Sequence, residues 1–189
     1  MPLLTALYDA CVLYPAPLRD LLVHLAITAP FRARWTLQIQ DEWISNLLQN
    51  RLDLKRERLE RTRALMNQSV RDCLVTDYES LIPALTLPDP NDRHVLAAAI
   101  VTKADVIVTF NLADFPASAL QAYGIEAQHP DSFIRRQLDS SPDAVLLAVQ
   151  RQRESLTNPT KTVEELLDTL ERQGLGETVA YLRRFSAFL

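Results

Sequence analysis

Glycine is rare in this sequence, with three among 189 residues, at positions 124, 174 and 176. A phosphate-binding P-loop and a dinucleotide-binding turn each need several glycines close together. The first half of the chain therefore contains neither kind of nucleotide site. A Gly-x-Ser-x-Gly elbow is also missing, and neither cysteine has a histidine close to it in the sequence, so a serine or cysteine hydrolase is not supported.

Cysteines and long apolar runs are few as well. The two cysteines, Cys11 and Cys73, lie in apolar segments, which is typical of reduced, buried residues rather than of a disulfide. No segment approaches the run of about 20 apolar residues that a membrane span needs. The N-terminus has no basic region and soon reaches Asp9, unlike a secretory signal peptide. We expect a cytoplasmic protein without a membrane segment.

Strand-like and helix-like patterns alternate along residues 1–130, which predicts an α/β fold with a parallel sheet. Strands are expected at residues 3–8, 70–75, 105–110 and 125–128. An amphipathic helix is expected over residues 54–66, with Leu65 among its inward-facing residues.

After Pro130 the pattern indicates helices only. Thr162 and Glu165 have the spacing of a capping box at the start of one of them. The sequence therefore predicts two parts, an α/β domain over residues 1–130 and an all-helical C-terminal extension over residues 131–189.

Acidic residues stand where several expected elements end or begin. Asp9 follows the first strand, and Asp114 follows the strand at 105–110. Asp92 opens a helix, and Glu42 flanks the buried face of another. The carboxyl ends of parallel strands share one edge, where open α/β sheets hold their sites. We therefore expect these acids to lie close together.

Four carboxylates without basic partners would repel one another, and a divalent cation removes that repulsion. Mg²⁺ and Mn²⁺ prefer oxygen ligands, and such centres usually act on phosphate esters. One or two ions would lower the pKa of a water for in-line attack and neutralise charge on the phosphate oxygens. Asp89 is either a further ligand or part of the loop between Pro88 and Pro90.

Each acid also has a simpler explanation when it is taken alone. Asp92 suits a helix cap, Asp9 suits a turn, and Glu42 suits a solvated helix face. Asn111 and Asp114 could likewise do no more than shape a turn after the strand. The joint arrangement is what favours a metal site over these alternatives.

Five segments together resemble the PIN-domain family, in its branch of VapC-type toxins from bacterial toxin–antitoxin pairs. Four of them are LYDACVLYPAPLRDLL, DEWISNLL, PDPNDRHVLAAAI and ADVIVTFNLADFP. The fifth, TNPTKTVEELLDTLERQGL, resembles the helical C-terminal extension of one subgroup. DRHVLAAAI followed closely by VIVTFNLADF is the most specific combination, and the resemblance covers nearly the whole chain.

The resemblance implies a PIN-like three-layer α/β/α fold and a metal-dependent, single-strand-selective ribonuclease. The four family acids correspond to Asp9, Glu42, Asp92 and Asp114. Asn111 matches a polar position that binds substrate or a metal-bound water. Cys11 departs from the small polar residue of many relatives, which puts a backbone or phosphate contact there in doubt. The resemblance further implies a small antitoxin as partner and a homodimer.

Single-stranded or structured RNA would need positive charge near the acids. Residues 51–63 contain six cations and three acids, whereas the whole chain has a net charge of -4. The candidate RNA contacts are Lys55, Arg56, Arg58, Arg19 and Arg93. The alternative for the 51–63 segment is a solvated helix face with i,i+4 ion pairs. Two alternative functions stay open: a non-catalytic PIN-like protein that binds RNA or a partner protein, and a DNA-repair nuclease.

Overall fold

The computed structural model describes residues 3–189, which group by their contacts into two compact units. The first unit runs from the N-terminus to Tyr14 and from Phe31 to His129, and the second comprises Pro15–Pro30 and Pro130–Leu189. The division into domains at residue 130 stays a prediction. By contacts alone, residues 15–30 group with the C-terminal segment.

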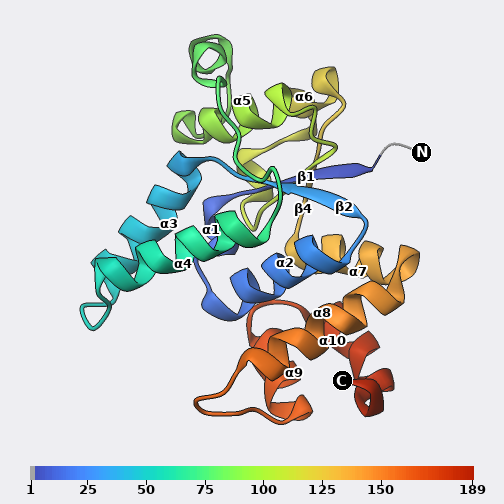
Figure 1. The fold of residues 1–189 in the computed structure, drawn as a ribbon. Helices are drawn as coiled ribbons and strands as arrows, with labels where there is room; N and C mark the ends of the chain where they lie inside the picture. Colours follow the sequence, from blue (N-terminus) through green and yellow to red (C-terminus); the bar gives the residue numbers. More distant parts are fainter. Residues whose placement is uncertain (1–2) are drawn as a thin grey trace. The chain divides into compact units, whose positions relative to one another are not determined.

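The first unit is built on a sheet of four parallel strands in the order β2-β1-β3-β4 (Figure 1). The strands are β1 (Leu4–Tyr8), β2 (Phe31–Arg34), β3 (Val106–Val108) and β4 (Glu126–Gln128). The predicted central parallel sheet is therefore confirmed. Because β1 and β3 are the two inner strands, their apolar residues are covered on both faces, and Leu7 and Ile107 are fully buried.

The pairing of β1 with β3 determines which residues leave the sheet together. Tyr8 pairs with Val108, and the backbone N–H of Asp9 donates to the carbonyl of Val108 at 3.1 Å. Asp9 and Thr109 therefore both emerge at the carboxyl edge, side by side. This is the edge at which the sequence predicts a site.

Helices lie on both sides of these strands, with α5 on one side and α4 on the other in Figure 1. The α-helices of the first unit are α1 (Ala10–Leu13), α3 (Leu37–Asn50), α4 (Arg56–Ser69), α5 (Arg93–Val101) and α6 (Ala117–Leu120). Its 3₁₀ helices are η1 (Glu79–Ala84), η2 (Pro90–Asp92), η3 (Leu112–Asp114) and η4 (Gln121–Tyr123). Trp35 and Trp43, both fully buried, belong to the core of this unit.

Three local expectations were wrong. Residues 70–75 form no strand, and their only ladder contact is an isolated bridge between Leu74 and Trp35. The second strand is instead β2, whose sequence FRAR has two arginines and so lacks the apolar run that indicates a strand. Leu65 is 56% exposed, because the inner face of α4 is formed by Leu59 and Met66.

The second unit is entirely helical. Its α-helices are α2 (Ala16–Thr28), α7 (Pro130–Ser140), α8 (Pro142–Ser155), α9 (Val163–Arg172) and α10 (Gly176–Leu182), followed by the 3₁₀ helix η5 (Arg183–Phe188). Asp131 in α7 accepts hydrogen bonds from the backbone N–H groups of Glu177 and Thr178, both at 2.9 Å. The carboxylate thereby satisfies N–H groups at the start of α10 that have no partner within the helix.

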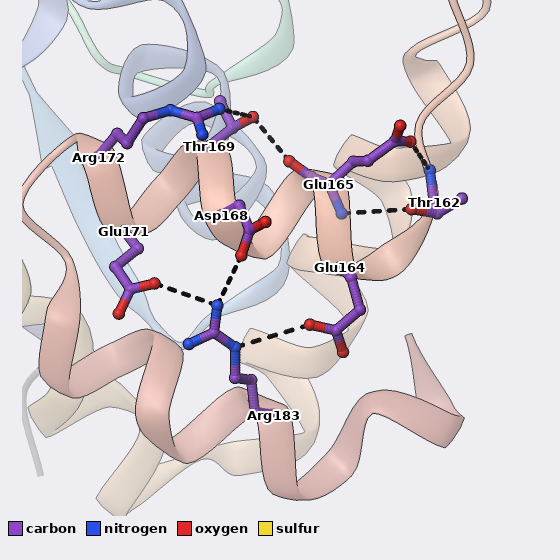
Figure 2. Close-up of polar contacts among 8 residues, drawn as sticks. All are labelled: Thr162, Glu164, Glu165, Asp168, Thr169, Glu171, Arg172 and Arg183. Atoms are coloured by element: carbon purple, nitrogen blue, oxygen red, sulfur yellow. Dashed lines mark hydrogen bonds and ion pairs between the residues drawn. The ribbon is translucent and has the colours of Figure 1, made fainter.

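Polar contacts around α9 are drawn in Figure 2. The predicted capping box is confirmed: Glu165 N donates to Thr162 Oγ1 at 3.2 Å, and Thr162 N donates to Glu165 Oε2 at 2.8 Å. Arg183 of η5 pairs with Asp168 at 2.6 Å and with Glu171 at 3.1 Å (Figure 2). These ion pairs hold η5 against the acidic face of α9.

Among residues 3–189, no helix is long and apolar enough to cross a membrane.

Candidate active site

Three of the four predicted acids line one hollow in the first unit. Asp9, Glu42 and Asp92 surround it together with Asn111, and its volume is about 350 Å³. Asp9 comes from the end of β1, Glu42 from α3, Asp92 from the junction of η2 and α5, and Asn111 from the segment after β3. The tertiary structure thus joins distant parts of the chain at the carboxyl edge of the sheet.

Asp9 is the most buried of these acids, at 4% exposed. Its carboxylate accepts hydrogen bonds from Ala10 N at 2.7 Å, Thr109 Oγ1 at 2.7 Å and Cys11 Sγ at 3.1 Å. The pKa of Asp9 is raised above its ordinary value, and burial is the largest cause. The three hydrogen bonds lower the pKa, and the charge of Glu42 raises it. The three donors therefore hold the Asp9 side chain in a defined position in the lining of the hollow.

Cys11 takes part in the same network. Its Sγ atom accepts a hydrogen bond from Phe110 N at 3.3 Å and lies 3.3 Å from Thr109 Oγ1. Burial, followed by the charge of Asp9, raises the pKa of Cys11 to about 12. The thiol thus stays protonated at neutral pH, and it acts as a hydrogen-bond donor to the carboxylate rather than as a nucleophile.

The pKa of Asp92 depends on its burial and on the charges of the other acids. Burial first, and then the charges of Asp9, Asp89 and Asp114, raise the pKa of Asp92 to about 6. Asp89 and Asp114 do not line the hollow, but their charges act on this carboxyl. Asp92 occupies the N-cap position of α5 without making a side-chain cap hydrogen bond. The simple explanation of Asp92 as a helix cap therefore has no support in its contacts.

Glu42 is held by a histidine from another helix. His94 Nε2 lies 2.7 Å from Glu42 Oε1, and the His94 side chain is 3% exposed against 37% for Glu42. The Nδ1 atom of His94 is buried and has no hydrogen-bond partner among residues 3–189. At this distance, Nε2 donates a hydrogen bond to the carboxylate of Glu42.

The cations predicted to contact RNA do not line the hollow. Lys55, Arg56 and Arg58 are exposed at the start of α4, outside the lining of the hollow. Arg93 Nε donates to the carbonyl of Pro90 at 2.9 Å. Arg19 belongs to α2 in the second unit and is 8% exposed, and burial lowers its pKa to about 10. Its burial leaves little surface for a phosphate.

Sequence reasoning did not single out several residues of the site. Thr109 is fully buried and donates a hydrogen bond to Asp9. The sequence feature that could have indicated this role is the hydroxyl residue within the apolar run VIVTF. Asn46 and Asn50 line the hollow from α3, and their signal was four-residue spacing from Glu42. Tyr14 lines it as well, and no feature of its sequence neighbourhood indicated that position.

The side chains of the hollow have the chemistry of a site for a hard divalent cation. Carboxylate and amide oxygens are the ligands that Mg²⁺ and Mn²⁺ prefer. Burial is the largest cause of the raised pKa of Asp92, and the charges of Asp9, Asp89 and Asp114 add to it; a cation would relieve the part that comes from repulsion. Among residues 3–189, no three His, Cys, Asp or Glu side chains stand close enough to form a ready-made metal cluster. The fit to a divalent cation therefore rests on the kinds of side chain in the lining, not on their spacing.

Comparisons with known proteins agree with this architecture. The family described as "PIN domain" matches residues 5–113, and the family described as "VapC50 C-terminal domain" matches residues 130–184. A protein of Mycobacterium tuberculosis (strain ATCC 25618 / H37Rv), named "Putative ribonuclease VapC50", is 43% identical over 96 residues, which span 51% of this chain and 56% of that protein. No solved structure matches the chain. The chain belongs to the PIN-domain family, and its C-terminal region matches the VapC50 C-terminal domain.

Proposed function

We propose that this protein is a metal-dependent endoribonuclease that hydrolyses RNA phosphodiesters. The observation that carries the proposal is the convergence of Asp9, Glu42 and Asp92 on one hollow at the carboxyl edge of the sheet. Membership of the PIN-domain family and the name of the mycobacterial relative, a ribonuclease, support RNA as the substrate. We expect products with 5′-phosphate and 3′-hydroxyl ends.

Asp9, Glu42, Asp92 and Asp114 would hold one or two Mg²⁺ or Mn²⁺ ions, with Asp89 as a further candidate ligand. A bound ion of this kind supplies a Lewis acid that lowers the pKa of water and neutralises charge on phosphate oxygens. The protein's own part is to orient the acids. Thr109 and Cys11 hold Asp9 through hydrogen bonds, and His94 holds one oxygen of Glu42.

Cations outside the hollow would attract the RNA backbone. Lys55, Arg56 and Arg58 are exposed on one helix turn, and Arg93 stands beside Asp92. Asn111 would contact the substrate inside the hollow. Because Arg19 is buried in the second unit, we do not include it among the proposed RNA contacts.

The resemblance to VapC-type toxins supports a role as the toxin of a type II toxin–antitoxin pair. We propose a small antitoxin as partner, which would inhibit the enzyme by covering the acidic hollow, and a homodimer in the cytoplasm. An adjacent small open reading frame, and copurification of its product with this chain, would support the pairing.

The proposed activity is tested with labelled single-stranded RNA and the purified chain in Mg²⁺ or Mn²⁺. EDTA should abolish cleavage, and Asp9→Asn and Glu42→Gln should each lower it by at least about a hundredfold, because loss of an outer-shell contact to a metal ligand alone costs about 10–100-fold. The matched control is Asp41→Asn, since Asp41 is an exposed acid on the same helix beside Glu42.

Cleavage that persists with EDTA and in Asp9→Asn would contradict the proposal. RNA binding without cleavage in any divalent metal would favour the non-catalytic binding protein instead. A preference for flap or single-stranded DNA over RNA in the same assay would indicate a DNA nuclease.

A further inference from the structure

We propose that the hollow also contains a subsite for one unpaired RNA base, formed by Asn46, Asn50 and Tyr14 next to the acids. This inference rests on the proposed ribonuclease function and adds to it a residue set that selects the nucleotide. All three side chains line the same hollow as Asp9 and Glu42.

The geometry of α3 places the amides beside the acidic centre. Glu42, Asn46 and Asn50 follow one another at four-residue spacing, so they lie along one face of the helix. With a rise of 1.5 Å per residue, each step along this face is about 6 Å. The hollow therefore continues from carboxylates near Glu42 to uncharged amides near Asn50.

The chemistry of this amide row suits a base rather than a phosphate. An asparagine amide has donors and an acceptor, which is what the edge of a nucleobase requires, whereas phosphates are held mainly by cations and N–H donors. Single-stranded RNA presents its bases unstacked, and proteins read them through hydrogen bonds and aromatic stacking. Tyr14 supplies an aromatic ring at the same place.

The side chains are positioned for such contacts. Asn50 Nδ2 donates to the Tyr14 hydroxyl at 3.2 Å, which links the amide to the ring. Among residues 3–189, the side chain of Asn46 makes no hydrogen bond, and it is exposed. Its amide can therefore bond to a ligand without breaking a contact within the protein.

The size of the hollow fits more than an ion. Its volume of about 350 Å³ lies within the range of about 300–1,000 Å³ that small-molecule sites occupy. A helical peptide would need a groove of apolar pockets for its anchor residues. The lining here is mainly polar, with Ala10 as its one small aliphatic side chain among the described lining residues, so a base fits better than a peptide anchor.

The test compares the wild type with Asn46→Ala/Asn50→Ala on a set of RNA oligonucleotides that differ in one nucleotide beside the cleavage site. The matched control is Gln49→Ala, because Gln49 is an exposed amide of α3 outside the lining of the hollow. Rates are measured in Mg²⁺ or Mn²⁺, and affinities for the same oligonucleotides are measured in Ca²⁺ by fluorescence anisotropy. Circular dichroism checks that each variant is folded, and Mn²⁺ titration checks that it binds metal.

We expect the wild type and Gln49→Ala to cleave oligonucleotides with one or two of the nucleotides roughly tenfold faster or more. The reason is that an amide that forms two hydrogen bonds with a base edge discriminates between bases. The double variant should lose this preference, so that it cleaves all the oligonucleotides of the set at similar rates. A double variant that keeps the wild-type preference overturns the inference, and so does a wild type without any preference; in both cases the ribonuclease proposal stands.

A wild type that binds with base preference in Ca²⁺ but cleaves nothing overturns the ribonuclease proposal while the subsite is retained. A wild type that neither binds nor cleaves RNA overturns both.

Discussion

His94 Nε2 of α5 lies 2.7 Å from Glu42 Oε1 of α3, and this contact joins a buried histidine to a half-exposed acid of the hollow. One oxygen of Glu42 is therefore occupied and oriented by the protein. A hydrogen-bond donor that fixes the orientation of a carboxylate in this way is common behind metal ligands. His94 is a positioning residue for Glu42.

Replacing His94 by alanine should weaken Mn²⁺ binding by about tenfold, because contacts behind a metal ligand are worth about 10–100-fold in affinity. His94→Gln keeps an N–H donor and should restore part of the affinity. Isothermal titration calorimetry measures the binding, and urea unfolding separates this effect from a loss of stability. Equal Mn²⁺ affinities in the wild type and His94→Ala would contradict the positioning role.

Asp92→Asn should stabilise the metal-free protein at about pH 7.5 by about 1 kcal/mol, a figure reduced for solvent screening because the carboxyl is partly exposed. The folded-state pKa of about 6 lies above the ordinary value of 3.8. Between these values the folded protein holds a proton that the unfolded chain has released, so the wild type loses stability as pH rises through this window. Asparagine carries no charge, so it avoids the cost of burying a carboxylate, which is the larger cause, and the repulsion from the other acids.

Urea unfolding in EDTA at several pH values measures this difference, with Asp41→Asn as control. The gain of Asp92→Asn should disappear at about pH 3, where both proteins are neutral at this position. Added Mn²⁺ should reverse the order, since it stabilises the wild type more. A gain that is independent of pH would mean that the charge of the Asp92 carboxylate is not its cause.

Reversing the charge at Arg56 and Arg58 to glutamate should weaken RNA binding and flatten its dependence on salt. Each lost phosphate contact lowers the slope of log affinity against log salt by about one. The helix itself should persist, because acids in the first turn of a helix are favourable. Anisotropy titrations from about 50 to 200 mM salt measure the slope.

The matched control for this pair is Arg71→Glu with Lys103→Glu, two exposed cations of the first unit outside α4. Lys103 precedes β3 and so lies toward the opposite edge of the sheet from Asp9. If the control pair flattens the slope as much as Arg56→Glu/Arg58→Glu does, the start of α4 has no special role in binding RNA.

Thr162→Ala should destabilise the start of α9 by about 1 kcal/mol, which is the usual cost of removing such a cap. The backbone N–H of Glu165 loses its acceptor in this variant. Hydrogen exchange at the Glu165 amide is the direct measurement. Thr160→Ala, at an exposed position ahead of the helix, should leave the exchange rate unchanged. Unchanged protection in Thr162→Ala would show that the box does not stabilise the helix.

Local patterns were sufficient where neighbours in sequence determine the structure. The apolar residues of Val106–Val108 predicted a buried strand, and Thr162 with Glu165 predicted a helix start, because both signals act within a few residues. The strand Phe31–Arg34 was missed, because its arginines hide the alternation in which Phe31 and Ala33 are buried and Arg32 is exposed. Its stability comes from pairing with β1, which the local sequence does not encode.

By itself, the sequence determined the alternation of strands and helices and the presence of acids where these elements begin and end, since both follow from short-range patterns. Only the tertiary structure decided which side chains meet. The parallel register of β1 with β3 places Thr109 against Asp9, and the packing of the first unit brings His94 to Glu42. Contacts of this kind join residues far apart in the chain, so they depend on pairing and packing of the whole unit rather than on any segment's own preference.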